Sequence, residues 1–191
     1  MKFTCNKEEL VKGINVVIRA AYGKYQKSIL ECIHIIARDG RLMLDAFDTT
    51  TAIKTTIYAE VSEPGQTAIP ARVFYDIVSK FPAGEICFER EGSTILVKGE
   101  NSKASLQEMD AEQFPSFPAL EGEQLSINRR VFREMVDKTA FSAYMGEDKP
   151  IFTGLLFETD PDAGRIHVVG IDGIRLAKNS APISCKEKLR S

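Results

Sequence analysis

Apolar and polar positions along the chain follow two different periods. Three stretches, 7–21, 71–81 and 129–143, repeat apolar residues every three or four positions, which predicts amphipathic helices. The runs between them alternate apolar and polar residues one by one, which predicts strands with one covered face. Gly, Pro and Asp clusters separate these runs and predict turns. We therefore expect an α+β fold in which helices lie on one face of antiparallel sheets.

Each predicted helix begins in the same way. A short strand leads into a residue suited to a helix start, and these residues are Asn6, Pro70 and Asn128. An asparagine side chain can accept a hydrogen bond from a first-turn N–H, and proline lacks an N–H that would need a partner. The three leading strands are predicted at 3–6, 67–70 and 125–128. The chain therefore contains a recurring unit of strand, cap, helix and further strands.

The third unit repeats the first in its strands as well. Residues 40–48 align with residues 164–172 at a constant shift of 124 positions. Such recurrence indicates an architecture built from repeated units, here about 60 residues each. Two units make one domain at 1–120, and residues 124–191 hold the first half of a second. The stretch 114–123, rich in Phe and Pro, is predicted to connect the two.

Composition and scattered reactive residues favour a binding protein over an enzyme. Hydrophobic residues make up 43% of the chain and charged residues 27%, as in ordinary globular proteins. We expect a cytoplasmic protein, because no apolar run approaches a membrane span and the first residues lack a signal-peptide core. The cysteines and histidines fall mostly in strand-like runs: Cys5, Cys32, Cys87, Cys185, His34 and His167. We expect them to be buried thiols and sheet histidines, with no metal site and no cofactor.

Charge is unevenly distributed. The helical segments 6–27, 70–81 and 128–141 together carry eleven Lys and Arg against five Asp and Glu, a net charge of +6. The whole chain is −2, so the remainder carries −8. A basic face attracts phosphates without reading sequence. Helices rich in Lys and Arg are also common as ordinary solvated faces, so charge alone leaves both interpretations open.

Several stretches together resemble one known family, the bacterial DNA polymerase sliding clamps (polymerase III beta subunits). The stretches that carry the resemblance are 1–4, 71–82, 114–118, 150–158 and 171–177. The family implies domains built from two helix-plus-strands units, with helices lining a central hole and sheets forming the rim. Its chains normally have three domains and close head to tail as a dimer around duplex DNA. This chain departs from that pattern, since it holds about one and a half domains.

The resemblance also implies individual sites. The positions that match DNA contacts of the family are Lys24, Arg72, Gly146, Lys149, Pro150 and Ile151. Some clamps have adjacent aromatic residues where this chain has Pro150 and Ile151. Polymerase subunits and the clamp loader insert short peptides into a cleft whose middle-domain side matches Phe152, Gly173, Ile174, Arg175 and Leu176. Ile174 stands where many members have histidine, and ordinary core packing is the alternative for Phe152 and Leu176.

Catalysis has little support in the sequence. Nucleotide-binding, metalloprotease and serine-hydrolase motifs are not found. Asp45, Asp48 and Asp172 could suggest metal-assisted phosphoryl chemistry, but aspartates at strand ends in turns explain them better. We therefore expect a non-catalytic processivity factor, or alternatively an interaction module that does not encircle DNA.

Two further expectations concern the shortened second domain. The peptide cleft should bind very weakly, because its wall from a third domain is missing. Without its other half, the segment 124–183 has three physical outcomes: disorder, aggregation, or pairing with a second copy. We favour pairing about a two-fold axis, which makes a homodimer.

Overall fold

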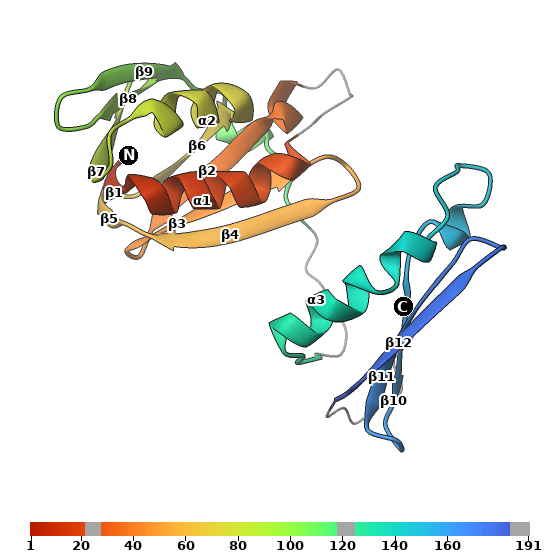
Figure 1. Ribbon diagram of the computed structural model, residues 1–191. Helices are drawn as coiled ribbons and strands as arrows, with labels where there is room; N and C mark the ends of the chain where they lie inside the picture. Colours follow the sequence, from red (N-terminus) through yellow and green to blue (C-terminus); the bar gives the residue numbers. More distant parts are fainter. Residues whose placement is uncertain (22–27, 118–124, 184–191) are drawn as a thin grey trace. The chain divides into compact units, whose positions relative to one another are not determined.

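The computed structural model describes residues 1–21, 28–117 and 125–183, which form two compact units divided between Pro118 and Ala119. Unit 1 contains helices α1 (Lys7–Val17) and α2 (Ala71–Lys80), and unit 2 contains α3 (Arg129–Asp137), as Figure 1 shows. The strands of unit 1 are β1 (Lys2–Asn6), β2 (Cys32–Arg38), β3 (Arg41–Phe47), β4 (Ala52–Tyr58), β5 (Glu60–Glu63), β6 (Gly65–Pro70), β7 (Glu85–Glu91), β8 (Thr94–Lys98) and β9 (Lys103–Gln107). Those of unit 2 are β10 (Leu156–Asp160), β11 (Arg165–Ile171) and β12 (Leu176–Pro182).

Unit 1 is built from two similar halves that exchange their first strands. One sheet has the order β5-β1-β7-β8-β9 and the other has the order β4-β3-β2-β6, and all neighbours are antiparallel. Strand β1 of the first half (2–63) thus joins the sheet of the second half (65–107). In return, β6 of the second half joins the sheet of the first half. This reciprocity gives unit 1 an internal approximate two-fold symmetry.

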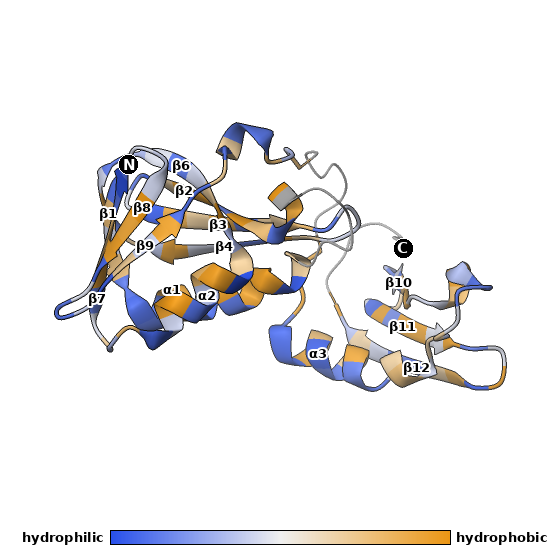
Figure 2. Ribbon diagram, turned by 90° about the horizontal axis from the view of Figure 1, so that it is seen from above, coloured by the Kyte–Doolittle hydropathy of each residue, from blue (hydrophilic) through white to orange (hydrophobic). Residues whose placement is uncertain are grey.

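The two halves share one core. Helices α1 and α2 lie side by side (Figures 1 and 2) and contact each other. Leu10 and Ile14 of α1 and Phe74 and Val78 of α2 are fully buried, as the three-to-four spacing predicts. Figure 2 shows both helices with hydrophobic and hydrophilic residues interleaved along their length. The predicted α+β fold with antiparallel sheets is confirmed.

The predicted helix starts are correct, but two predicted helix ends are not. The Asn6 side chain accepts a hydrogen bond from the Glu9 N–H at 3.1 Å, and that of Asn128 accepts from the Arg130 N–H at 2.9 Å. The first helix ends at Val17 and continues as the short 3-10 turn η1 (Ile18–Ala20). The third ends at Asp137, well before the predicted 143, because the Thr139 hydroxyl donates to the Met135 carbonyl and a 3-10 turn, η4 (Ala140–Ser142), follows. The remaining 3-10 turns are η2 (Ser28–Glu31), η3 (Ala111–Gln113) and η5 (Pro150–Phe152).

Unit 2 corresponds to the first half of unit 1. Its sheet has the order β10-β11-β12, and β3 and β4 map onto β11 and β12 at the shift of 124 seen in the sequence. Met135 of α3 packs on this sheet against Ile166, Val168 and Ala181. The strand predicted at 125–128 is not formed, since its counterparts β1 and β6 pair with strands of the opposite half, and the described residues of unit 2 contain one half.

Candidate nucleic-acid interface and partner surface

The basic side chains of α1 and α2 lie mainly on their solvent sides. Lys12 of α1, Arg72 and Lys80 of α2, and Arg19 of the turn η1 after α1 are all exposed. Lys12 is held by Glu9 at 2.7 Å one turn earlier, so its charge is partly compensated. The strand residues around these helices point their apolar side chains into the core, and the cations stay in water. The solvent side of α1 and α2 therefore carries a net positive charge.

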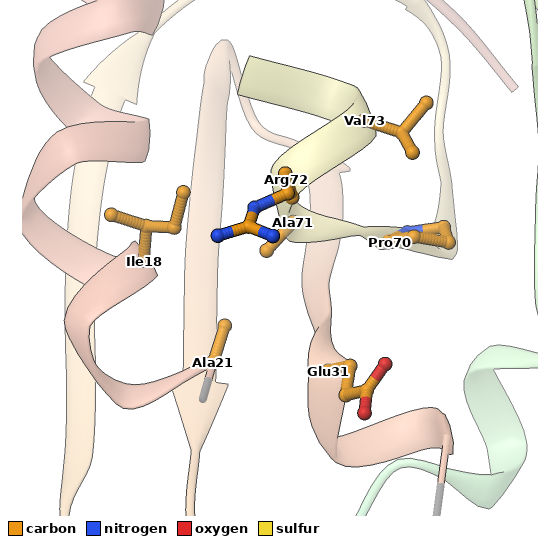
Figure 3. Close-up of a pocket in the computed structure, with 7 residues that line it drawn as sticks. All are labelled: Ile18, Ala21, Glu31, Pro70, Ala71, Arg72 and Val73. Carbon is orange, nitrogen blue, oxygen red and sulfur yellow. The ribbon is translucent and has the colours of Figure 1, made fainter. Parts of the chain in front are cut away.

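Arg72 lies at a hollow between the turn η1, which follows α1, and the start of α2. The hollow measures about 420 Å³ and its walls are formed by Ile18, Ala21, Glu31, Pro70, Ala71, Arg72 and Val73. Figure 3 shows the Arg72 guanidinium extending from the first turn of α2 toward Ile18, with the Glu31 carboxylate at a different edge. The wall ends at Ala21, and Lys24, the other predicted basic contact in this region, lies outside the described residues.

Helix α3 adds a second basic surface, on unit 2. Arg129, Arg130 and Arg133 are exposed. Arg133 pairs with Asp137 at 3.5 Å, and Lys138 pairs with Glu134 at 2.6 Å. The Lys138 pair lowers the pKa of the Glu134 carboxyl, chiefly through its hydrogen bond. The net positive charge of α3 therefore resides mainly in its first turn.

The predicted DNA-contact loop is organised around a tyrosine that the sequence did not single out. The Tyr144 N–H donates to the Phe152 carbonyl at 2.8 Å and closes the loop. The Tyr144 hydroxyl donates to Asp148 at 2.5 Å, and the Lys149 ammonium lies 5.6 Å from the ring centre. Gly146 lies against the same ring, because a Cβ at this position would come within 2.6 Å of it. In the sequence, Gly146 and Lys149 follow this tyrosine by two and five residues, which does not reveal the packing of both against its ring.

The charge of this loop differs from that expected of a phosphate-binding segment. Gly146, Lys149, Pro150 and Ile151 lie on it as predicted, with Lys149, Pro150 and Ile151 exposed. The neighbouring Glu147 and Asp148 are exposed as well, so two acidic side chains accompany its single lysine. Phosphate contacts from this loop are therefore weaker candidates than those from the helices.

Three of the predicted peptide-binding residues, Gly173, Ile174 and Arg175, lie in an exposed turn between β11 and β12, and Leu176 is the first residue of β12. The Asp172 carboxylate accepts hydrogen bonds from the N–H groups of Ile174 and Arg175, each at 2.9 Å, and these bonds lower its pKa. Gly173 has a φ of +90°, which favours glycine at this turn. Ile174 is 98% exposed, and Leu176 is 62% exposed.

Core packing is therefore the wrong explanation for Leu176, while Phe152 is half-buried at the end of the Tyr144 loop. The Arg175 guanidinium lies 5.8 Å from the ring centre of Phe141, which follows α3. Phe141 and Met145 are themselves exposed, Met145 at 94%, and the sequence analysis did not single them out. The exposed surface at this turn thus includes Phe141, which the resemblance did not indicate.

The aspartates considered for metal chemistry are each explained locally. Asp45 was expected in a turn but lies inside β3, buried, with His34 at 3.8 Å and Lys54 at 4.0 Å. Asp48 accepts hydrogen bonds from Thr50 and Thr51 in the turn that follows. Within the ranges that the structure describes, no three His, Cys, Asp or Glu side chains gather as a metal site. In the same ranges no helix is long and apolar enough to cross a membrane.

The two histidines are sheet residues, as predicted. His34 lies in β2, where its Nε2 is 3.3 Å from Gln66 Oε1 and its ring stacks on Phe114 at 4.9 Å. His167 lies in β11. Cys5 and Cys32 are buried as expected, whereas Cys87 is only half-buried and Cys185 lies outside the described residues.

Comparison with known proteins decides the family. The model of the family described as "DNA polymerase III beta subunit, N-terminal domain" matches residues 1–118. The chain belongs to the DNA polymerase III beta subunit family. Its relatives include the beta sliding clamp of Escherichia coli strain K12, 31% identical over 186 residues, which cover 96% of this chain and 50% of that protein. The beta sliding clamp of Bacillus subtilis strain 168 is 25% identical over 197 residues, covering 98% and 52%.

Solved structures of the beta subunit family agree with the fold. The DNA polymerase III subunit beta from Pseudomonas aeruginosa matches with a TM-score of 0.89 and 26% identity, over 100% of this chain and 52% of that one. The Helicobacter pylori beta clamp, solved bound to a DNA ligase peptide, matches with a TM-score of 0.85 and 24% identity, over 100% and 55%. The chain thus spans about half the length of the beta clamps it matches.

Proposed function

We propose that the chain is a non-catalytic scaffold that binds duplex DNA without reading its sequence, as a sliding clamp of the replicative DNA polymerase does. The observation that carries the proposal is the exposure of Arg19 on the turn η1 that follows α1, of Arg72 and Lys80 on α2, and of Arg129 and Arg130 on α3. Basic side chains on helix surfaces attract phosphates equally on all sequences. We assign 1–120 to the clamp N-terminal domain and 124–191 to the first half of the middle domain. A cytoplasmic location follows, because bacterial duplex DNA lies there.

DNA topology separates this function from the alternative of an interaction module that does not encircle DNA. The chain is loaded on a nicked circular duplex, and its retention is compared after the circle is linearised with a restriction enzyme. A protein that encircles DNA slides off the new ends, so retention should fall on linearisation. Equal retention on both forms would favour a groove-type contact, and no retention on either at low salt would contradict DNA binding.

A second function, peptide capture, is supported by the exposed turn. Ile174 and Leu176 offer apolar surface, and Arg175 offers a cation beside Phe141. Polymerase subunits and the clamp loader would present short linear motifs to it. An anchor side chain of a peptide binds tightly only in a pocket that encloses it. Ile174 is 98% exposed, so it forms no wall of such a pocket. Isothermal calorimetry with a clamp-binding peptide should therefore give affinity much weaker than that of a full-length beta clamp, and equal affinity would contradict this expectation.

A further inference from the structure

The four-stranded sheet of unit 1 has one face covered by a helix. Helix α1 runs along β3 and β4 on that face (Figure 1), and a Cβ added at its Gly13 would come within 2.8 Å of the Leu44 side chain. Side chains alternate along a strand, so the neighbours of the buried residues point to the opposite side. We call that side the outer face, and on β2 and β3 it carries Cys32, His34, Ile36, Arg38, Arg41, Met43, Asp45 and Phe47.

One end of the outer face is covered by the segment 109–117, with which the described part of unit 1 ends. The Phe114 ring stacks on His34 of β2, with ring centres 4.9 Å apart. The centre of the Phe117 ring lies 4.3 Å from the Lys54 ammonium of β4. Basic side chains attract the electron-rich faces of aromatic rings. The outer face therefore binds this segment through its aromatic side chains.

The segment 109–117 is acidic as well as aromatic. It contains Asp110 and Glu112, both exposed, and its sequence includes no Lys or Arg. The preceding residue, Glu108, pairs with Arg90 at 2.8 Å. Unit 1 thus shows with its own chain the kind of segment that this face accepts, one in which carboxylates accompany aromatic anchors.

The other end of the outer face is exposed. Ile36 lies opposite Met43, and both are half-buried. One row closer to the β2–β3 hairpin, Arg41 lies opposite Tyr58, which is 77% exposed. A hollow of about 340 Å³ opens here, and its walls are formed by Arg38, Asp39, Arg41, Met43 and Thr56. This end therefore combines apolar surface, an aromatic ring and cations around a concave site.

The charges at the hollow are not balanced within the sheet. Arg38 and Arg41 lie directly opposite each other on β2 and β3, and like charges in such a pair repel. Within the part of the chain that the structure describes, neither guanidinium has an ion pair or a hydrogen bond. Asp39, in the turn between them, supplies one carboxylate against two cations. An added anionic group would relieve the repulsion, and a guanidinium binds a carboxylate through two parallel hydrogen bonds.

We propose that the exposed end of the outer face binds an acidic peptide segment of a partner protein. Arg38 and Arg41 hold its carboxylates, and an aromatic or large apolar side chain enters the hollow against Met43, as Arg, Tyr and Met commonly do at protein interfaces. A peptide fits this site better than duplex DNA, because a rigid duplex offers no side chain for the hollow. The proposal is separate from DNA binding, since it concerns the face of the sheet away from α1.

Selection from a phage library of random peptides, each about 12 residues long, tests the proposal on the full chain. The library is first depleted on Arg38→Glu/Arg41→Glu and then selected on the wild type, and urea unfolding verifies that both proteins are folded. Peptides that bind elsewhere on the chain are removed in the first step. We expect the enriched peptides to contain several Asp or Glu and at least one aromatic or large apolar residue. No enrichment, or enrichment of basic or purely apolar peptides, would overturn the proposal.

Fluorescence anisotropy with the most enriched peptide supplies the second readout. Arg41→Glu should weaken binding by roughly ten-fold or more, as for the loss of a charge-assisted hydrogen bond. The matched Lys103→Glu makes the same change in charge at an exposed position of β9 and should keep the wild-type affinity. Replacement of the peptide's Asp and Glu by Asn and Gln should weaken binding as Arg41→Glu does. An equal loss in both protein variants, or displacement of the peptide by an excess of random duplex DNA, would overturn the proposal, whatever the outcome for DNA binding by the helices.

Discussion

The ring of Phe3 on β1 stacks on the ring of Phe88 on β7, with centres 4.8 Å apart and planes 15° from parallel. The two strands come from different halves of unit 1, and the Phe74 ring of α2 meets Phe88 edge-on at 6.1 Å. Phe88 of β7 therefore packs against both the exchanged strand β1 and the helix α2. Phe88→Ala should lower the free energy of unfolding of unit 1 by about 3–5 kcal/mol, measured by urea denaturation. Val16→Ala on the exposed side of α1 should cost less than about 0.5 kcal/mol, and equal effects would contradict the shared core.

Glu108, just after β9, accepts hydrogen bonds from residues in both sheets of unit 1. Its Oε2 accepts hydrogen bonds from Thr67 at 2.6 Å and from the Nε of Arg90 at 3.1 Å and Nη2 at 2.8 Å. Thr67 is fully buried, so removal of the carboxylate leaves its hydroxyl without this acceptor. Glu108→Ala should destabilise unit 1 by about 1–3 kcal/mol in thermal or urea unfolding. The exposed Glu91→Ala serves as control, and a neutral Glu108→Ala would show that the network contributes nothing.

His34 should make the stability of unit 1 depend on pH. Burial, the largest cause, lowers the pKa of His34, while the hydrogen bond with Gln66 and the charge of Asp45 oppose this effect and Lys54 adds to it. A histidine in the unfolded chain titrates near about 6.5, so the unfolded state binds the proton more readily. The stability that neutral His34 contributes to the folded state is therefore fully present above about pH 6.5. It is lost as the pH falls from there to the lower pKa of the folded state.

The matched comparison is wild type against His34→Gln. The difference in the free energy of unfolding between the two proteins should shift against the wild type when the pH falls from 7.5 to 5. A difference that stays constant, or that shifts in favour of the wild type at pH 5, would contradict a buried neutral His34.

The buried Cys5 and Cys32 should react with thiol reagents much more slowly than the half-buried Cys87. Burial raises the pKa of Cys5 to about 12 and that of Cys32 to about 11, so little thiolate exists at pH 8. N-ethylmaleimide should modify the half-buried Cys87 of the native protein long before either of them, with peptide mass mapping as the readout. All three should react rapidly in urea. Native Cys5 labelled as fast as Cys87 would show that β1 detaches from its sheet.

The fold was largely predictable because helix and strand periods are local signals. Asn6 and Asn128 marked helix starts correctly, since capping depends on neighbouring residues. The strand predicted at 125–128 failed for a non-local reason: a strand needs a partner, and the partners of its counterparts come from another half. The helix end at Asp137 was hidden by apolar residues that continue beyond it in a 3-10 turn.

The site was predictable only in part. The family resemblance pointed to Arg72 and Ile174, and both are exposed. The sequence could not single out Tyr144, whose importance comes from a loop closed by the Phe152 carbonyl eight residues away. It also set Asp45 in a turn, since a buried aspartate inside β3 is recognised only once His34 and Lys54 are seen beside it.

The central claim is that the helix face of unit 1 binds DNA through its cations. Fluorescence anisotropy on a random duplex, repeated across a salt series, tests it with wild type, a Lys24→Glu/Arg72→Glu variant and an Arg38→Glu/Arg41→Glu variant. Arg38 and Arg41 are exposed on the β2–β3 hairpin and give the same change in net charge. We predict that Lys24→Glu/Arg72→Glu weakens binding alike on all sequences and makes the slope of log K against log salt shallower by about 1–2, while the hairpin variant keeps the wild-type slope. Identical slopes for all three proteins would contradict the account.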